Sequence, residues 1–152
     1  MTSQSDIYGA LIAKFLAAQD RVYPQALGEL RAGRKQTHWM WFIFPQLAGL
    51  GHSDMARRYA LGDLDEAAAY AAHPVLGARL LECTEAVLLH TPGSVAPRDL
   101  RSIFGTPDDL KFISSMTLFA RTLPDRRAFR AALSAFNGGH EDERTVALLE
   151  TV

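Results

Sequence analysis

Apolar residues recur at helical spacing along most of the chain, and this pattern predicts a succession of short helices. From Ile7 to Ala18 they occupy positions 7, 11, 12, 15 and 16, the three- and four-residue steps of an amphipathic helix. A second helix is expected from Tyr23 to Gly33, because Pro24 suits a first turn and glycine suits a helix end. Strand-like alternation is absent except around residues 40–44.

Capping signals indicate where the later helices begin. Ser53 is expected to be an N-cap residue, and Asp63 with Glu66 three residues later resembles a capping box. Further helices are expected from Pro74 onward, Pro97 to Gly105, Thr106 to Arg121, a cap at Asp125 to Phe136, and Asp142 to Glu150. The prediction is an all-α fold, a compact single-domain bundle of about seven to nine helices over residues 1–152, with 1–5 and 140–152 poorly ordered.

Composition is that of an ordinary globular protein, with 48% hydrophobic residues, 22% charged residues and a net charge of −1. This balance argues against a disordered chain and against a strongly basic nucleic-acid binder. The single cysteine, Cys83, cannot form an internal disulfide and is expected in the core of a cytoplasmic protein. The longest apolar run, Trp39–Phe44, is far shorter than the roughly 20 residues of a membrane span, and Met1–Asp6 does not resemble a signal peptide.

That apolar run, WMWFIF, contains both tryptophans of the chain. Burial of six such side chains supplies roughly 10 kcal/mol or more of gross hydrophobic stabilisation, so we favour a place in the core. A buried indole N–H also needs a partner, and a histidine and a glutamine lie nearby. The candidates for a pocket in this stretch are therefore His38, Trp39, Trp41 and Gln46.

Positive charge flanks the aromatic run. Between Arg31 and Arg58 there are five basic residues and one acidic residue, a local net charge of +4, and residues 36–53 contain no charged side chain. Such a pattern can attract an anion. The favoured interpretation is a buried segment with solvated ends, because most charge runs lie at the surface without a binding role.

A second candidate stretch is the predicted helix that contains Asp108, Lys111 and Ser115. Steps of three and four residues place these polar side chains on one face of a helix that is otherwise largely apolar. One interpretation is a functional strip that faces the aromatic run. The other is an internal Asp–Lys pair with serine hydroxyls bonded to their own helix carbonyls. Elsewhere, Gln19 and Tyr23 at a helix junction are expected to form only a surface turn.

Several motifs that carry known chemistry are missing. The sequence has no Walker loop, no GxGxxG, no GxSxG and no HExxH, and its five histidines show no metal-ligand spacing. We therefore expect neither a cofactor nor a metal. No basic amphipathic helix indicates a membrane or a nucleic acid as a partner.

The strings AQDRVYPQALGELRAGRKQTHWMWFIFPQLAGLG, MARRYAL, HPVLGARL and IFGTPDDLKFISSMTLF closely resemble a bacterial family of unknown function, DUF1810, also called Rv1873-like. The resemblance spans about residues 15–136. It implies a compact all-helical single-domain fold and no known activity.

The leading hypothesis is a small-ligand-binding protein, with catalysis left open, whose cleft lies between residues 38–46 and the 108–117 helix. Lys35 and Lys111 would attract an anionic molecule, for which a nucleotide-like ligand is one candidate. Trp39, Trp41, Gln46 and Ser115 would line the cleft. If a reaction occurs, His38 is the acid–base candidate, with Asp108 or Asp109 as its partner.

The alternative function is a protein–protein interaction module or a homodimerisation domain without catalysis. In that case the aromatic stretch would form a groove or a flat apolar face. A third interpretation is that the two stretches only pack against each other and that the site lies elsewhere.

Overall fold

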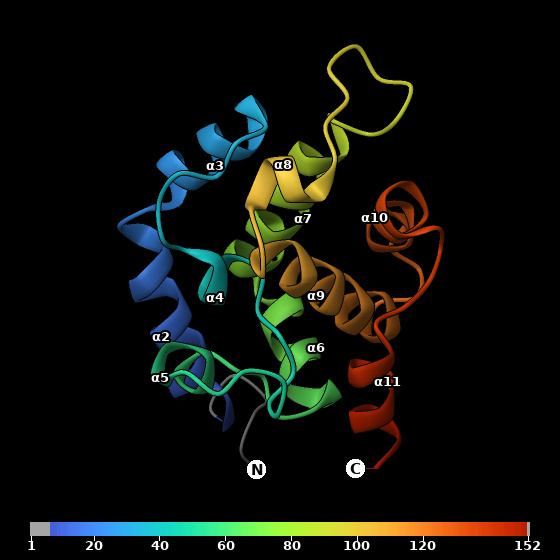
Figure 1. Ribbon diagram of the computed structural model, residues 1–152. Helices are drawn as coiled ribbons and strands as arrows, with labels where there is room; N and C mark the ends of the chain where they lie inside the picture. The colour runs from blue at the N-terminus through green and yellow to red at the C-terminus, as the bar shows by residue number, and fades with distance from the viewer. Residues whose placement is uncertain (1–6, 152) are drawn as a thin grey trace.

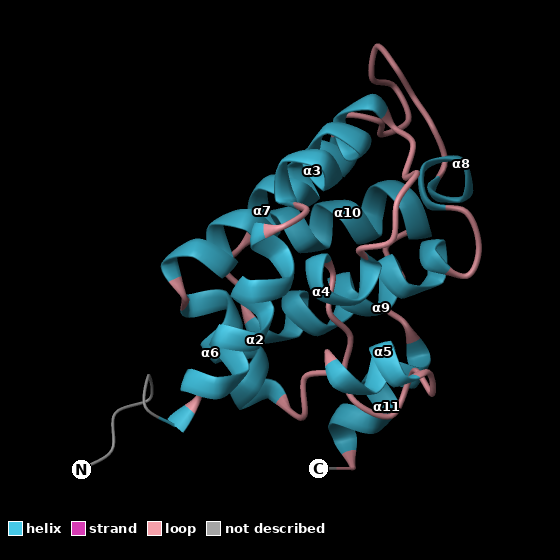
Figure 2. Ribbon diagram, turned by 90° about the vertical axis from the view of Figure 1, so that its left-hand side faces the viewer, coloured by secondary structure: helices cyan, strands magenta, loops and turns pink. Residues whose placement is uncertain are grey.

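The computed structural model describes residues 7–151, which form ten helices and no strand (Figures 1 and 2). The all-α prediction is confirmed. Ten helices exceed the predicted seven to nine because three of them, α4, α5 and α8, have only four or five residues. The helices are α2 (Gly9–Asp20), α3 (Tyr23–Ala32), α4 (Met40–Ile43), α5 (Asp54–Arg58), α6 (Leu64–Ala72), α7 (Pro74–Leu88), α8 (Leu100–Phe104), α9 (Asp108–Thr122), α10 (Arg127–Asn137) and α11 (Glu143–Glu150).

Side-chain caps begin several of these helices as the sequence predicts. The Ser53 hydroxyl accepts the Ala56 N–H at 3.1 Å, and Asp63 Oδ1 accepts the Glu66 N–H at 2.9 Å. The Glu66 carboxylate returns to accept the N–H of Gly62 at 3.0 Å, one residue earlier than in the usual capping box. These bonds satisfy N–H groups that have no partner inside the helix.

Three helix starts differ from the prediction. Helix α9 begins at Asp108 instead of Thr106 and has no side-chain cap. Helix α8 begins at Leu100 instead of Pro97, because the Asp99 carboxylate caps it by accepting the Ser102 N–H at 2.8 Å. Helix α10 has no side-chain cap, so the predicted role of Asp125 is wrong.

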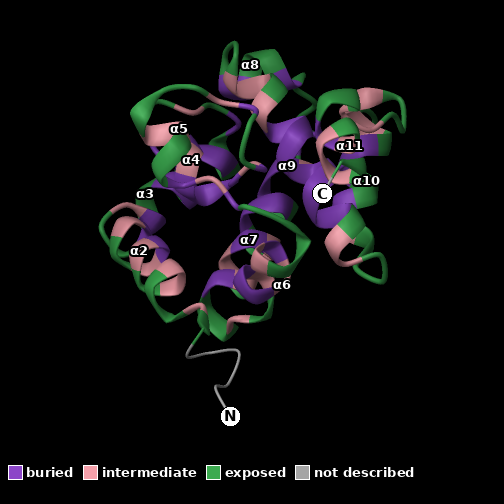
Figure 3. Cartoon of the chain, turned by 90° about the horizontal axis from the view of Figure 1, so that it is seen from below, coloured by how far each residue is buried: buried purple, intermediate pink, exposed green. Residues whose placement is uncertain are grey.

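Helix α9 is the centre of the molecule. Its residues 112–120 are all buried, and α6, α8, α10 and α11 pack against it (Figure 3). Helix α7 packs against α3, α6 and α10. A helix buried on most of its surface must be apolar or internally hydrogen-bonded, and α9 is both.

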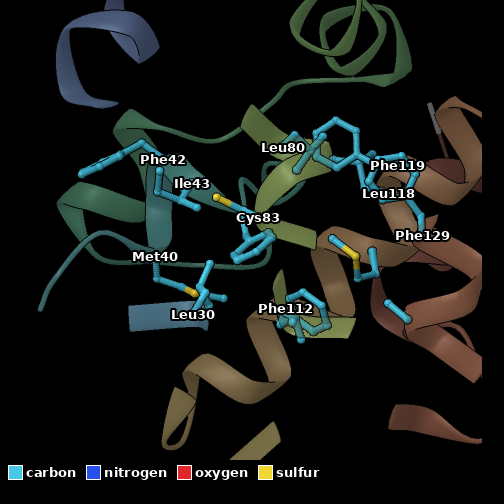
Figure 4. Packing of buried hydrophobic residues seen from close by; sticks show 14 of the residues in the cluster. Leu30, Met40, Phe42, Ile43, Leu80, Cys83, Phe112, Leu118, Phe119 and Phe129 are labelled. Carbon is cyan, nitrogen blue, oxygen red and sulfur yellow. The ribbon is translucent and has the colours of Figure 1, made fainter. Parts of the chain in front are cut away.

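Aromatic side chains join the short helix α4 to α8 and α9. The Phe44 ring meets Phe112 edge-on, with ring centroids 5.0 Å apart, and Phe104 at 5.9 Å. Phe104 and Phe112 stack at 5.0 Å. Five of the six side chains in the run at 39–44 are buried, which confirms the core interpretation for all but the half-buried Trp41 (Figure 4).

The expected surface turn at Gln19 and Tyr23 is wrong, because both side chains are buried in polar contacts. The Gln19 amide donates to the Phe42 carbonyl at 2.7 Å, a carbonyl at the end of α4 that needs a partner. The same amide lies 2.8 Å from the Tyr70 hydroxyl. The Tyr23 hydroxyl donates to the Glu82 carboxylate on α7. These bonds tie α2, α3, α4, α6 and α7 together.

Helices α6 and α7 meet at a sharp corner without a connecting loop. His73 ends α6 and caps α7, where its Nδ1 accepts the N–H groups of Val75 at 3.2 Å and Leu76 at 3.3 Å. A Cβ at Gly77 would lie 2.1 Å from the Ala71 carbonyl oxygen, so only glycine allows this approach of the two helices.

The C-terminal part of the chain departs from the prediction of poor order. Residues 140–151 are described, and α11 packs against α9. The expectation for residues 1–5 falls outside the described residues. Within residues 7–151, no helix is both long enough and apolar enough to cross a lipid bilayer.

We predict that Phe44→Ala lowers the free energy of unfolding by about 3–5 kcal/mol, because it leaves a cavity between three aromatic rings. Urea denaturation of the purified protein measures the loss. Leu110→Ala is the control, since Leu110 is 63% exposed on α9 and its truncation should change stability by less than about 0.5 kcal/mol. Equal losses in the two variants would contradict the packing described here.

Candidate functional site

A buried carboxylate organises the segment between α3 and α4. Glu29 is 8% exposed, and its Oε1 accepts three N–H groups: the backbone N–H of Gln36 at 2.8 Å, that of Thr37 at 3.0 Å and the indole N–H of Trp39 at 2.9 Å. Its Oε2 accepts the Thr37 hydroxyl at 2.8 Å and the Gln25 amide at 3.1 Å. All of these donors lie within ten residues of Glu29 in the chain, so the carboxylate closes a local loop.

These bonds also determine the charge state of Glu29. Burial by itself would raise the pKa of the carboxyl group. The hydrogen bonds from Gln36, Thr37 and Trp39 favour the ionised form more strongly and lower the pKa to about 2. Glu29 is therefore a carboxylate at neutral pH, with its lone pairs used by the protein.

A cluster of alternating charges lies at the start of α9. The Asp108 carboxylate is 3.1 Å from Lys35 Nζ and 3.2 Å from Lys111 Nζ. The Lys35 side chain is only 9% exposed, whereas that of Lys111 is 25% exposed. The Lys35 backbone N–H donates to the Ile103 carbonyl at 2.7 Å, which fixes the base of this side chain beside α8. The cluster has a net charge of +1, and its more exposed end is Lys111.

Each ammonium group also lies near a tryptophan ring. Lys35 Nζ is 5.2 Å from the ring centroid of Trp39, and Lys111 Nζ is 5.8 Å from that of Trp41. Both distances are within the range of cation–π attraction. The two stretches singled out in the sequence therefore do meet in space, through lysine, aspartate and tryptophan side chains.

Three of the predicted site residues do not line an accessible site beside this cluster. Trp39 is fully buried with its indole N–H bonded to Glu29, so it anchors the segment and does not form an accessible wall. His38 is exposed on the loop before α4. Ser115 is fully buried, and within residues 7–151 its hydroxyl has no hydrogen-bond partner. The spacing along α9 does not show that Ser115, unlike Lys111, is completely buried.

A groove of about 630 Å³ lies beside the exposed end of the cluster, between α9, α11 and the loop at 46–51. Polar groups come from Gln46, Lys111 and Ser114, and cationic charge also comes from Arg144 on α11. Leu110 and other apolar side chains form part of its floor. Of the predicted site residues, Gln46 and Lys111 line this groove. His38, Trp39 and Trp41 are not among the described residues that line it.

Acidic side chains in the groove are mostly committed to other partners. Glu141 pairs with Arg121 at 2.7 Å and with Arg130 at 3.0 Å, and these guanidinium groups, Arg121 first, lower its pKa to about 2. Asp142 caps α11 and accepts the Ser114 hydroxyl at 3.1 Å. Glu143 is the acidic lining residue that remains exposed.

Several residues of this region could not be identified from the sequence pattern. Glu29 is an ordinary-looking residue of an amphipathic helix, and only the folded loop brings its five donors together. Arg144 belongs to the tail that was expected to be poorly ordered. Ser114 lines the groove, whereas its neighbour Ser115, the predicted site residue, does not.

Metal binding and thiol chemistry receive no support from the side chains present. Within residues 7–151, no group of three or more His, Cys, Asp or Glu side chains is arranged to hold a metal ion. Cys83 is buried, and burial raises the pKa of its thiol to about 12, so the group stays protonated at neutral pH. A protonated thiol is a poor nucleophile, and Cys83 is a core residue as predicted.

This all-helical fold belongs to a family without an assigned activity. The family described as "Protein of unknown function (DUF1810)" matches residues 10–149, and the chain is a member of it. The chain is also similar to a crystal structure of the conserved hypothetical protein Rv1873 from Mycobacterium tuberculosis, with 52% identity, a TM-score of 0.86, and coverage of 93% of this chain and 97% of that chain. No curated protein matches the chain. The resemblance predicted from sequence is confirmed, and it extends through α11.

We predict that Glu29→Gln destabilises the protein by about 2–3 kcal/mol at pH 7, because a side-chain amide presents N–H groups to buried donors. The pH dependence should also change. The folded-state pKa of Glu29, about 2, lies below its ordinary value of 4.5, so its contribution is complete above pH 4.5 and is lost as the pH falls toward 2. The variant should therefore lose less stability than the native protein over this range.

Urea denaturation between pH 2.5 and 7 measures both effects. Glu141, whose pKa is also lowered, contributes the same part to both proteins. Glu85→Gln on the exposed face of α7 is the matched control and should reproduce the native profile. Parallel profiles for the native protein and Glu29→Gln would contradict the assigned role of Glu29.

We further predict that Asp108→Asn costs about 3 kcal/mol of stability, because it leaves the nearly buried Lys35 ammonium without its carboxylate. The double variant Lys35→Met/Asp108→Asn should regain at least about 1 kcal/mol, since the unpaired charge is then removed as well. Thermal and urea unfolding of both variants, with Lys35→Met alone, give the coupling. A double variant less stable than Asp108→Asn would show that Lys35 is not stabilised mainly by Asp108.

Proposed function

We propose that the protein binds a small anionic molecule in the groove between α9, α11 and the loop at 46–51. One observation carries the proposal: Lys111 and Arg144 line the same groove, while Glu141 and Asp142 beside them are already bound to other groups. The cations therefore retain capacity for an additional acceptor. An arginine has five N–H donors, and Arg144 uses one on the Leu50 carbonyl at 3.2 Å.

The size and lining of the groove fit a metabolite-sized ligand. Small-molecule sites are commonly concavities of about 300–1,000 Å³, with apolar walls and a few converging polar groups. Leu50, Leu110 and Ile113 supply the apolar surface, and the amides of Gln46 and Asn137 supply donors and acceptors. A phosphate or carboxylate attached to a partly apolar body matches this distribution.

The buried part of the charge cluster supports the groove from behind. Asp108 lies between Lys35 and Lys111 and holds the Lys111 ammonium at the groove without neutralising the whole cluster. Lys35 and Trp39 would then position Asp108 and Lys111 without touching the ligand. Trp41 would restrict the Lys111 side chain through its ring face.

The proposal concerns binding. Asp108 lies between two ammonium groups, and His38 projects from an exposed loop. We therefore assign neither of these predicted catalytic residues a role in a reaction. The interaction-module alternative remains as an outcome of the experiment below.

A thermal-shift screen with inorganic phosphate, adenosine monophosphate, glucose 6-phosphate and citrate tests the proposal. A compound at a hundred times its dissociation constant should add about 2.7 kcal/mol, or roughly 5–10 °C for a chain of this length. Lys111→Ala and Arg144→Ala should each remove most of the shift, because each deletes a cation from the groove. Rising salt concentration should reduce the shift of the native protein.

Arg57→Ala is the matched control: it deletes an exposed cation of α5 that is outside the lining of the groove. It should leave the shift unchanged. A shift that persists in both groove variants would show that the ligand binds elsewhere. No shift with any compound, together with concentration-dependent self-association in sedimentation velocity, would favour the interaction-module alternative.

A further inference from the structure

A second hollow, separate from the groove above, lies between α2 and the corner of α6 and α7. Its volume is about 590 Å³. One wall consists of Ile12, Ala13 and Leu16 on α2, and the other includes Ala69 and Ala72 on α6. Short side chains on α6 leave the space open, and leucine and isoleucine make it apolar.

Two polar side chains border this hollow, Tyr8 and His73. The role of His73 follows from its capping bonds. Because Nδ1 accepts the N–H groups of Val75 and Leu76, the neutral ring carries its proton on Nε2. That N–H has no hydrogen-bond acceptor within residues 7–151 and is available to a ligand. His73 also borders a smaller hollow of about 320 Å³ on the side of Leu123 and Phe129.

The charges around the hollow oppose an anionic ligand. Desolvation, together with the negative charges of Asp65, Asp63 and Glu66, raises the pKa of the Tyr8 phenol. The same carboxylates repel an anionic head group near Tyr8. The Tyr8 hydroxyl and the His73 N–H therefore suit an uncharged oxygen better than a carboxylate or a phosphate.

We propose that this hollow binds an uncharged, mainly apolar molecule that carries one hydrogen-bonding oxygen, the class of long-chain alcohols and ketones. The apolar body lies between Ile12, Leu16 and the alanines of α6, and the oxygen accepts the His73 Nε2–H. Its volume falls within the range of small-molecule sites. This site is independent of the anion groove and shares none of its lining residues.

The neutral fluorescent probe N-phenyl-1-naphthylamine, titrated into the full chain, tests the proposal. Its fluorescence should rise on binding, and 1-decanol should displace it at a concentration at least about tenfold lower than decanoate. Ala72→Trp should reduce probe affinity at least about tenfold, because the indole fills the hollow from an exposed helix position. Ala131→Trp, at an exposed position of α10 outside the lining of the hollow, is the matched control.

His73→Asp separates the two roles of the imidazole, because an aspartate carboxylate caps helices well but has no N–H to donate. Its unfolding midpoint should stay near that of the native protein, while its affinity for 1-decanol should fall about two- to tenfold. Lys111→Ala should leave probe binding unchanged.

Three results would overturn the proposal: no fluorescence rise with the native protein, equal displacement by decanoate and 1-decanol, or native probe affinity in a folded Ala72→Trp variant. If Ala72→Trp fails to fold by circular dichroism, Ala13→Trp on the opposite wall replaces it and carries the same expectation.

Discussion

The ionised carboxylate of Glu29 constrains the path of the chain between α3 and α4. A buried carboxylate is tolerated only where its oxygens are fully hydrogen-bonded, and here two backbone N–H groups, a hydroxyl, an amide and an indole satisfy it. The loop after α3 must therefore return over Glu29, and Trp39 enters the core at a fixed orientation. The aromatic run at 39–44 places Phe44 against α9, and Lys35, in the loop before this run, reaches Asp108.

Helix α9 connects this segment to the candidate anion site, because it packs against Phe44 and also lines the groove. Its apolar face packs in the core, while its hydroxyl residues hold the C-terminal helix. Thr117 donates to the Ile113 carbonyl at 2.8 Å and accepts the Asp142 N–H at 2.8 Å, and Ser114 bonds both Leu110 and Asp142. Each of the two sequence interpretations of this helix is therefore partly correct. Asp108 and Lys111 form an internal pair, and hydroxyl groups bond to helix carbonyls. Lys111 also meets the aromatic segment at Trp41.

Local signals accounted for most of the architecture, because caps, first-turn prolines and apolar periodicity act within a few residues. Ser53 and Asp63 cap helices as their sequence contexts indicate. The site was harder to predict, because burial of a polar residue depends on partners distant in the chain. Gln19 is hidden by residues 23 and 51 positions away, and no periodicity reports this. Lysine and tryptophan side chains do lie close together, as the sequence predicts. The sequence does not show that Lys111 is partly exposed whereas Trp39 is fully buried.

The corner between α6 and α7 forms part of the wall of two hollows. His73 is the only residue between the two helices, and Gly77 lies close to the Ala71 carbonyl, so no flexible loop joins α6 to α7. Ala72, His73 and Pro74 form a partition that borders a hollow on each side. The two hollows therefore have these three residues in common, and a substitution at any of them changes a wall of both.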